Sequence, residues 1–208
     1  TKAFLGQMLV LYILCLKISK TRNDLDDLTY QKNIKNLKEL PNALKECLKT
    51  ENNIQVMAKE FLDAKGSMFL GRGLSYPIAL EGALKLKELS YLHAEGYPAG
   101  EMKHGPLALI EEGLPVIVIA PKDKYFEKTL SNMQEVISRG GKILFITDNK
   151  KDLINENIRF GVRVPLLDNL LSPFLMSIPL QLLAYHVALL KNCDIDKPRN
   201  LAKSVTVE

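Results

Sequence analysis

An unbroken apolar run, Val116-Ile117-Val118-Ile119-Ala120, lies just past the middle of the chain. A strand with one solvated face alternates apolar and polar residues, so a run without alternation predicts a strand buried on both faces, as in a parallel sheet. Further short apolar segments predict strands at 67–70, 142–147 and 160–164.

Helical spacing of apolar residues separates these strands and predicts helices over 51–62, 76–92, 123–138 and 172–191. Gly140-Gly141 is a candidate C-cap, and Pro179 is expected to kink the last helix. Strands that alternate with helices indicate an α/β layered domain with a mainly parallel sheet. Because such sheets bind ligands at the carboxyl ends of their strands, the Gly71–Gly73 turn and the loop after Ala120 are candidate sites.

The first fifty residues follow a different pattern. Residues 3–20 predict an apolar helix, and its most apolar segment, 8–16, is about half the length that crosses a bilayer. We therefore expect a helix buried in something larger, which completes a domain whose earlier part lies upstream. Residues 22–50 are more polar and are expected to form a linker of two helices divided at Pro41.

The overall composition narrows the class of protein. The net charge of +4 is spread along the chain, which argues against a dedicated nucleic-acid surface and weakly favours an anionic small substrate. Cys15, Cys47 and Cys193 are odd in number and form no CxxC motif, so neither a zinc site nor a disulfide framework is indicated. The expected state is three reduced, buried thiols in a cytoplasmic protein.

A tight turn, Gly71-Arg72-Gly73, joins a predicted strand to the helix over 76–92. Ser75 is a candidate N-cap, and the backbone amides there could bind an anion. Tyr76 occupies the place of the third glycine in GxGxxG, so the dinucleotide-binding fingerprint is absent. A strand–helix turn without a ligand explains the same residues equally well.

Three charged residues follow on the same helix, at Glu81, Lys85 and Glu88. Their spacing of four and three places them within about 60° of one another on one stripe. One interpretation is a solvated stripe whose Glu–Lys pair contributes about 0.3–0.5 kcal/mol. The alternative is a carboxylate base held beside an ammonium group.

Residues 93–106 are dense in glycine, proline and ionisable groups, which predicts a functional loop. His104 precedes Gly105-Pro106 and suits proton transfer near neutral pH, although a structural hydrogen bond is equally compatible. His93 is undecided and leans towards a structural role. His186 lies in an apolar helix and is expected to be packed in the core.

The C-terminal segment, Pro198-Arg199-Asn200-Leu201-Ala202-Lys203-Ser204-Val205-Thr206-Val207-Glu208, has no helical or strand period. A lysine amine can attack a carbonyl and form a Schiff base once it is desolvated or placed near another cation. Lys203 therefore makes the tail a candidate active-site element. An ordinary solvated tail is the alternative.

Three motifs together resemble one enzyme family. They are Gly71-Arg72-Gly73 with Tyr76-Pro77 through Glu81-Gly82-Ala83-Leu84-Lys85-Leu86-Lys87-Glu88; Ala94-Glu95 through Gly100-Glu101-Met102-Lys103-His104-Gly105-Pro106; and the tail from Pro198. Over essentially its whole length, the chain resembles the C-terminal part of the glutamine–fructose-6-phosphate aminotransferases (isomerizing), also called glucosamine-6-phosphate synthases. The segment 21–50 is the least similar.

The resemblance implies a fold and a domain organisation. The fold is a sugar-isomerase (SIS) type three-layer α/β domain, with a mainly parallel five-stranded sheet flanked by helices. Residues 1–20 would be the last helix of a preceding, truncated SIS module and 21–50 a helical linker. Residues 51–192 would form the second SIS module, and 193–208 a C-terminal tail that contributes to the active site.

The resemblance also implies roles for individual residues. Glu88 matches the base that moves a proton between C2 and C1, and Lys85 a lysine that assists near that proton. His104 matches the residue that opens the sugar ring, acting in the neighbouring subunit's site. Lys203 matches the lysine that forms an imine with fructose 6-phosphate, and the Ala202 backbone a sugar contact. This chemistry requires no metal or redox cofactor.

The resemblance further implies a cytoplasmic homodimer that acts on fructose 6-phosphate and glucosamine 6-phosphate, with an upstream glutaminase domain in the full-length protein. No nucleic-acid or membrane partner is expected. The glutaminase and the Ser/Thr-rich phosphate loop of the first module are absent from this sequence, so we expect little or no synthase activity from this chain alone. The alternatives are a fructosamine-phosphate deglycase and a non-catalytic SIS module that senses phosphosugars.

Overall fold

A five-stranded sheet forms the centre of the molecule in the computed structural model, which describes residues 1–149, 158 and 160–199. The strands are β1 (Gly66–Gly71), β2 (His93–Pro98), β3 (Pro115–Ile119), β4 (Lys142–Thr147) and β5 (Phe160–Arg163). Their order in the sheet is β2-β1-β3-β4-β5, and every neighbouring pair is parallel. The α/β class expected from the sequence is confirmed.

The inner strands bury both faces, as their unbroken apolar runs predict. Phe69 on β1 pairs with Ile117 on β3, which pairs with Leu144 on β4, and all three belong to one core cluster. The next residues along each strand, among them Val118 and Phe145, point to the opposite face and belong to a second cluster. The sheet therefore separates two cores.

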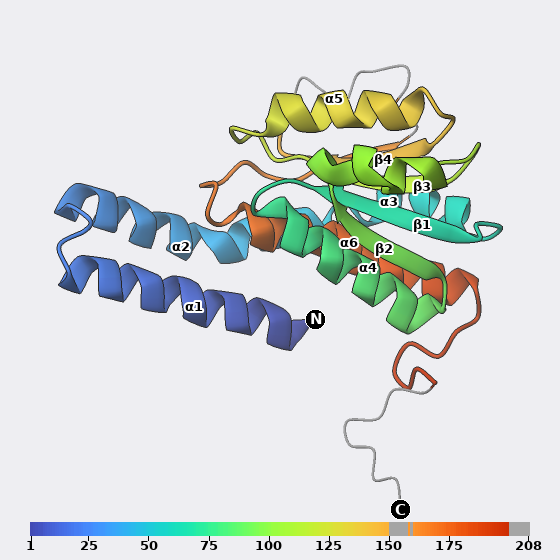
Figure 1. Cartoon of the computed structure of the whole chain (residues 1–208). Coiled ribbons are helices and arrows are strands. Elements are labelled where there is room, and N and C mark those ends of the chain that lie inside the picture. Colours follow the sequence, from blue (N-terminus) through green and yellow to red (C-terminus); the bar gives the residue numbers. More distant parts are fainter. Residues whose placement is uncertain (150–157, 159, 200–208) are drawn as a thin grey trace, which may run out of the picture.

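Helices cover both faces and complete three layers (Figure 1). Helices α3 (Glu51–Ala58), α4 (Ser75–Ser90) and α6 (Ser172–Leu190) contribute to the first cluster, and the short η1 (Lys59–Phe61) follows α3. Helix α5 (Phe126–Ile137) and the 3₁₀ helices η2 (Ala99–His104) and η3 (Pro106–Leu109) cover the other face. The three-layer arrangement is confirmed, and α6 continues as one helix through Pro179.

Strand β2 corrects the prediction of a loop over 93–106. Its polar residues His93, Glu95 and Tyr97 alternate with Ala94 and Gly96. Among the described strands it pairs with β1 alone and lies at the edge of the sheet, so its polar side chains reach solvent while Ala94 is buried. The glycine and proline density concealed this period of two.

Helix α2 (Asp27–Leu48) corrects the expected division at Pro41, because it runs through the proline as one helix. Pro41 is exposed, whereas Leu40 and Cys47 are buried in the first core cluster. Apolar contacts on both sides of the proline outweigh the cost of the lost backbone hydrogen bond, so the helix stays continuous. The boundaries of the linker and of the two modules stay a prediction.

Helix α1 (Lys2–Thr21) forms as expected but is largely exposed. Leu16 is its one buried residue, and Val10, Leu11 and Leu14 are open to solvent. By length and apolar composition, two helices of the described residues could cross a membrane, α1 and α6. Two-thirds of the α6 segment is buried inside the protein, which is typical of the core helix of a soluble domain.

Several local predictions are settled by hydrogen bonds and burial. Ser75 is buried and is the first residue of α4, not its N-cap, which is Leu74. At the end of α5 the C-cap is Ser138, not a glycine. Gly140, with φ of +80°, and Gly141, which donates to the Val136 carbonyl, form the turn that follows it.

The three thiols differ from the expectation that all are buried. Cys47 is buried, which raises its pKa to about 12, whereas Cys193 is partly exposed and Cys15 is exposed. Cys15 lies on the open face of α1, where few other elements pack against it.

Candidate active site

Helix α4 holds three charged side chains in one cluster. The Lys85 Nζ lies 2.6 Å from the Glu88 Oε2 and 3.8 Å from the Glu81 Oε1. The exposed fractions of the Lys85, Glu81 and Glu88 side chains are 18%, 12% and 27%. The solvated-stripe interpretation is therefore wrong, because all three side chains are mostly withdrawn from water.

Glu81 is the most buried member of this cluster. Burial raises the pKa of its carboxyl group above the ordinary value, and the ammonium of Lys85 opposes that rise. The buried Glu81 Oε1 accepts no hydrogen bond within the described part of the chain. Two carboxylates thus share one ammonium group, and Glu88 holds the shorter contact.

The opposite side of α4 fixes the cluster on a rigid support. Ala79, Ala83 and Leu86 are buried against the sheet and α6. A Cβ on Gly82 would lie 2.8 Å from the Leu180 Cδ1, so this glycine permits the close packing of α4 on α6. The helix can therefore hold Lys85 and Glu88 in a fixed relation to the core.

His104 lies at the other end of the molecule from this cluster. His104 is the last residue of η2, which follows the carboxyl end of β2. Helix α4 starts near the carboxyl end of β1, and Glu88 lies thirteen residues further on, about 20 Å along the helix. The His104 side chain is 76% exposed and lies 3.9 Å from the Glu101 Oε2. Within one chain the structure does not bring His104 together with Glu88 and Lys85.

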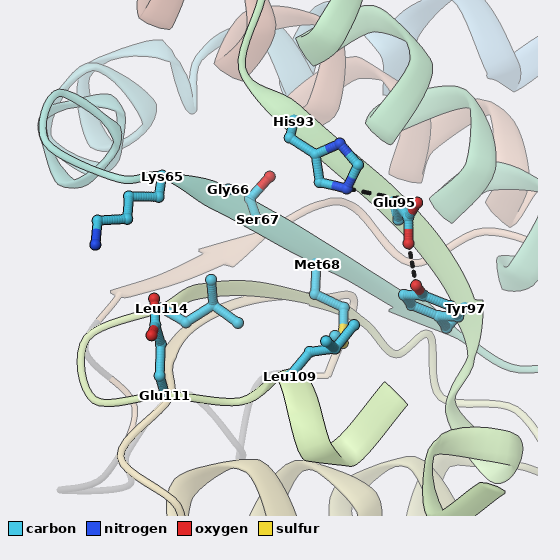
Figure 2. A pocket seen from close by; sticks show the side chains of 10 residues that line it. All are labelled: Lys65, Gly66, Ser67, Met68, His93, Glu95, Tyr97, Leu109, Glu111 and Leu114. Carbon is cyan, nitrogen blue, oxygen red and sulfur yellow. Dashed lines mark hydrogen bonds and ion pairs between the residues drawn. The ribbon is translucent and has the colours of Figure 1, made fainter. Parts of the chain in front are cut away.

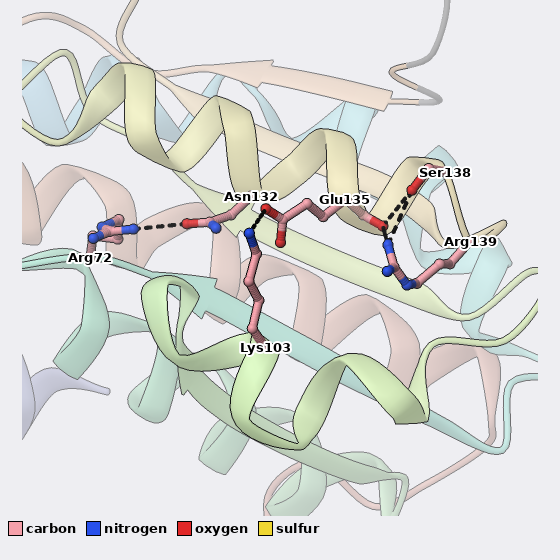
Figure 3. Close-up of polar contacts among 6 residues, drawn as sticks. All are labelled: Arg72, Lys103, Asn132, Glu135, Ser138 and Arg139. Carbon is pink, nitrogen blue, oxygen red and sulfur yellow. Dashed lines mark hydrogen bonds and ion pairs between the residues drawn. The ribbon is translucent and has the colours of Figure 1, made fainter.

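Polar contacts hold η2 against α5 (Figure 3). The Arg72 guanidinium donates to the Asn132 Oδ1 at 2.9 Å, and it lies so close beneath Gly100 that a Cβ there would be 2.9 Å away. The Lys103 Nζ lies 3.1 Å from the Glu135 Oε1. These contacts orient the segment that ends in His104. The sequence analysis named Arg72 only as part of a tight turn and missed this contact.

A second polar group, missed in the sequence, lines a shallow pocket of about 220 Å³ beside β2 (Figure 2). The Tyr97 hydroxyl donates to the Glu95 carboxylate, and the His93 Nε2 lies 3.5 Å from the Glu95 Oε1. The carboxylate acceptor and burial raise the pKa of Tyr97 to about 12. The alternation of these residues along an edge strand was the available signal.

His186 is buried as predicted, with its Nε2 3.1 Å from the Glu51 Oε1. This contact joins α6 to the start of α3, so His186 has a structural partner in the core. It lies on helices that pack on the first core cluster and belongs to none of the groups described above.

Lys203 and Ala202 lie outside the described residues, but the start of the tail is placed. The Arg199 backbone donates to the Tyr91 hydroxyl at 2.8 Å, and its guanidinium lies 4.1 Å from the centre of the Tyr91 ring. Tyr91 caps α4 in a left-handed conformation, three residues after Glu88. The tail therefore departs from the end of α4 that carries Glu88.

The carboxyl ends of β1 and β3, expected to bind a ligand, enclose a hollow of about 390 Å³. Tyr125 partly fills this crevice: a Cβ on Gly73 would lie 2.6 Å from the Tyr125 Cε2. The strand order reverses between β1 and β3, so this is the switch point where such sheets bind ligands. Here an aromatic ring occupies much of that position.

Comparison with known proteins places this site in a family. Residues 60–191, well over half of the chain, match the family described as SIS domain. The chain belongs to the SIS domain family. The matched region contains all five strands and the α4 cluster, so the SIS fold expected from the sequence motifs is confirmed.

Relatives within the SIS family extend the match to the whole chain. A glutamine–fructose-6-phosphate aminotransferase (isomerizing) from Bartonella henselae is 50% identical over 209 residues, which cover 100% of this chain and 34% of that protein. The chain thus spans about a third of the length of the curated relatives that it matches. The resemblance recognised in the three sequence motifs is confirmed.

Solved structures also match this chain. The C-terminal domain of glucosamine-fructose-6-phosphate aminotransferase from Francisella tularensis has a TM-score of 0.91 and 44% identity, over 95% of this chain and 56% of that one. A glucosamine-6-phosphate deaminase from Thermotoga maritima has a TM-score of 0.70 and 26% identity, over 100% of this chain and 57% of that one.

Proposed function

We propose that this chain is the sugar-isomerase part of a glutamine–fructose-6-phosphate aminotransferase, which converts fructose 6-phosphate and glutamine-derived ammonia into glucosamine 6-phosphate for amino-sugar synthesis. The observation that carries the proposal is the withdrawn α4 cluster, in which Lys85 lies 2.6 Å from Glu88. This cluster occurs in a chain that is about 50% identical, over its whole length, to glutamine–fructose-6-phosphate aminotransferases (isomerizing).

Glu88 is the proposed base that moves a proton between C1 and C2 of the sugar. A general base must be positioned and ionised when the substrate arrives. The Lys85 ammonium donates to the Glu88 carboxylate, which fixes the orientation of the carboxylate. Glu81 in turn holds Lys85 from the other side, so it positions the pair without contacting the reacting atoms.

Lys203 is the proposed amine that forms an imine at C2 of fructose 6-phosphate. The amine attacks the carbonyl and water leaves; ammonia then displaces the lysine and remains on the sugar as the amino nitrogen. Arg199 is anchored on Tyr91, and Lys203 follows it by four residues, a reach of at most roughly 14 Å. This spacing supports a shared site for Glu88 and Lys203, with the backbone of Ala202 as a sugar contact.

His104 is the proposed residue that opens the sugar ring, and we assign it to the site of a neighbouring subunit. The His104 side chain is exposed, and it lies far from Glu88, which is near the other end of α4. Both observations fit a role in the site of another subunit. The proposed assembly is a cytoplasmic homodimer with an upstream glutaminase domain in the full-length protein.

Trapping with borohydride tests the proposal in the full-length protein that contains this chain. With fructose 6-phosphate, peptide mass spectrometry should find a reduced hexitol-phosphate adduct on Lys203. Glu88→Gln should keep this adduct but lower formation of glucosamine 6-phosphate by about 10²–10⁴-fold. Imine formation does not need the Glu88 carboxylate, whereas the proton transfer between C1 and C2 does.

Glu127→Gln is the matched control, since this carboxylate is exposed on α5. It should leave both adduct and product unchanged. Binding of fructose 6-phosphate without any adduct on Lys203 would contradict the imine role and favour a phosphosugar sensor. Product formation at the wild-type rate by Glu88→Gln would remove Glu88 from the mechanism.

A further inference from the structure

The tyrosine that caps α4 has an unusual backbone conformation. Tyr91 has φ of +60° and ψ of +12°, which is the left-handed region. Among the described residues, two further non-glycine residues have a positive φ, and both are asparagines, Asn23 and Asn192. Asparagine tolerates this region, whereas a bulky aromatic residue there is strained. The strain at Tyr91 points to a role for its side chain.

The turn at the end of α4 does not itself need a tyrosine. The Tyr91 backbone N–H donates to the Lys87 carbonyl at 3.1 Å. The buried Ser90 hydroxyl donates to the Leu86 carbonyl at 2.6 Å. Neither bond involves the Tyr91 side chain, and glycine or asparagine is the usual residue at a left-handed helix end.

The Tyr91 side chain holds Arg199 instead. Its hydroxyl accepts the Arg199 backbone N–H at 2.8 Å, and the Arg199 guanidinium carbon lies 4.1 Å from the centre of its ring. A guanidinium over an aromatic ring is attracted by the negative face of the ring. One side chain therefore makes two different contacts with one residue of the tail.

The segment between α6 and Arg199 follows a defined path to this contact. Asn192 has φ of +53° and turns the chain directly after α6. The Asp194 carboxylate then accepts the backbone N–H groups two and three residues further on, at 3.0 and 2.9 Å, which forms a second turn. Pro198 restricts the backbone immediately before Arg199. Tyr91 thus binds the tail where a preformed segment ends.

We propose that Tyr91 is a positioning residue, which anchors the C-terminal tail at Arg199 beside the end of α4 that carries Glu88. Glu88 lies three residues before Tyr91, so the anchor fixes the start of the tail near the proposed base. The contact with Arg199 compensates for the strained backbone of the tyrosine. The consequence for catalysis rests on the proposed function, in which Lys203, four residues after Arg199, forms the imine.

Tyr91→Asn separates the anchor from the turn, because asparagine suits the left-handed backbone but lacks the ring and the hydroxyl. In this 208-residue chain, trypsin should cleave after Arg199 about tenfold faster in the variant, since the guanidinium must leave the ring before the protease can bind it. The midpoint of urea unfolding should be unchanged or higher, because the backbone strain is relieved.

Two further variants calibrate the cleavage assay. Tyr91→Phe keeps the ring and loses only the hydroxyl acceptor, so its cleavage rate should lie between those of wild type and Tyr91→Asn. Tyr30→Asn is the matched control, because Tyr30 is a half-buried tyrosine of α2 with a cation–π partner of its own, Lys20. It should leave cleavage after Arg199 at the wild-type rate.

The full-length protein tests the consequence for catalysis. With fructose 6-phosphate and borohydride, Tyr91→Asn should form the adduct on Lys203 about tenfold more slowly than wild type. The kcat should fall by a similar factor at similar KM, because the lysine spends less time beside the sugar carbonyl. Tyr30→Asn should change neither quantity.

The two measurements fail in different ways. Cleavage after Arg199 at the wild-type rate in Tyr91→Asn would overturn the anchor. Faster cleavage with an unchanged adduct rate would overturn the positioning of Lys203. A lower kcat together with a lower unfolding midpoint would make Tyr91 a structural residue only. Absence of an adduct in wild type would contradict the imine proposal, while the cleavage rates would still decide whether Tyr91 anchors the tail.

Discussion

At the scale of single residues, the ionisation of Asp148 makes the stability of the fold depend on pH. Burial raises the pKa of this carboxyl above its ordinary value of 3.8, because its charged form loses hydration. The folded state therefore holds this proton more tightly than the unfolded chain. The resulting contribution to stability is complete below pH 3.8 and is lost as pH rises through the folded pKa.

Asp148→Asn is the variant that reveals this dependence, because it removes the titration and keeps an acceptor for the Lys122 backbone N–H, which bonds to Asp148. We expect the free energy of unfolding of the variant, relative to wild type, to increase from pH 3.8 towards pH 7. Urea unfolding at a series of pH values measures it. Asp63→Asn, at an exposed position, is the matched control. A difference that falls as pH rises would contradict the assigned direction.

The sequence predicted which residues form the α4 cluster but not their burial. The spacing of Glu81, Lys85 and Glu88 requires one stripe in any helix. Whether that stripe is solvated depends on the elements packed beside it, which no local pattern encodes. Asp148 was missed for the same reason, since a polar residue after a strand is common and only the sheet order places it beside Lys122 and Arg163.

At the scale of elements, α2 shows how packing overrides a local rule. A proline inside a helix removes one hydrogen bond and costs roughly 3 kcal/mol, which is why the sequence predicted a break at Pro41. Leu40 and Cys47 pack on the same core on either side of it, and this shared contact keeps one helix. Strand β2 shows the converse, since a segment that the sequence predicted as a loop forms a strand through pairing with β1.

Pro41→Ala should therefore stabilise this chain. Alanine restores the missing N–H at an exposed position, and the gain is partly offset by the greater entropy of the unfolded chain. We expect an increase of about 1–2 kcal/mol in the free energy of unfolding, measured by urea denaturation. Asn42→Ala, the exposed neighbour, should change it by only a few tenths of a kcal/mol. A destabilised Pro41→Ala would mean that the proline itself is needed for packing.

The η2 helix depends on contacts from outside its own sequence, which Figure 3 shows. Arg72→Ala removes the bond to Asn132 and the support beneath Gly100. Hydrogen exchange by mass spectrometry should find η2 amides exchanging about tenfold faster, since one charge-assisted bond is worth about 1.5–3 kcal/mol. If His104 opens the sugar ring as proposed, the full-length protein should show a lower kcat at similar KM, because His104 is less well positioned.

Arg139→Ala is the matched control for this prediction. Arg139 follows α5 and donates to the Ser138 hydroxyl and the Glu135 carbonyl, and among the described residues no hydrogen bond or ion pair joins it to η2 (Figure 3). Its removal should leave exchange in η2 and kcat unchanged. Equal effects of both variants would mean that α5 is loosened as a whole and that Arg72 has no specific role in orienting η2.

At the scale of the whole molecule, the sequence predicted the layers but not the order of the strands. Each apolar run predicts a buried strand by itself, and alternation with helices predicts parallel pairing. The order β2-β1-β3-β4-β5 depends on pairings between distant segments, for which the sequence carries no local signal. Lys122 lies in a loop that the sequence analysis named, but only the strand order places it in one cavity with Arg163.

At the scale of the whole molecule, helix α1, whose course Figure 1 shows, carries a group of exposed apolar side chains. Leu11 and Leu14 are 60% and 49% exposed, and Val10 and Ile18 extend the same surface. Exposed apolar patches of this kind mark interaction surfaces or aggregation sites. The expectation that this helix packs inside something larger thus has a physical basis in the structure.

We therefore expect this 208-residue chain to self-associate through α1. Leu11→Lys/Leu14→Lys should reduce the associated fraction in sedimentation velocity, because two charges on the patch oppose burial of its apolar area. The unfolding midpoint should change little, since both side chains are exposed. Gln7→Lys adds charge to an exposed position of α1 without removing apolar surface, and it should associate as wild type does. Association that persists in the double variant would locate the contact on another surface.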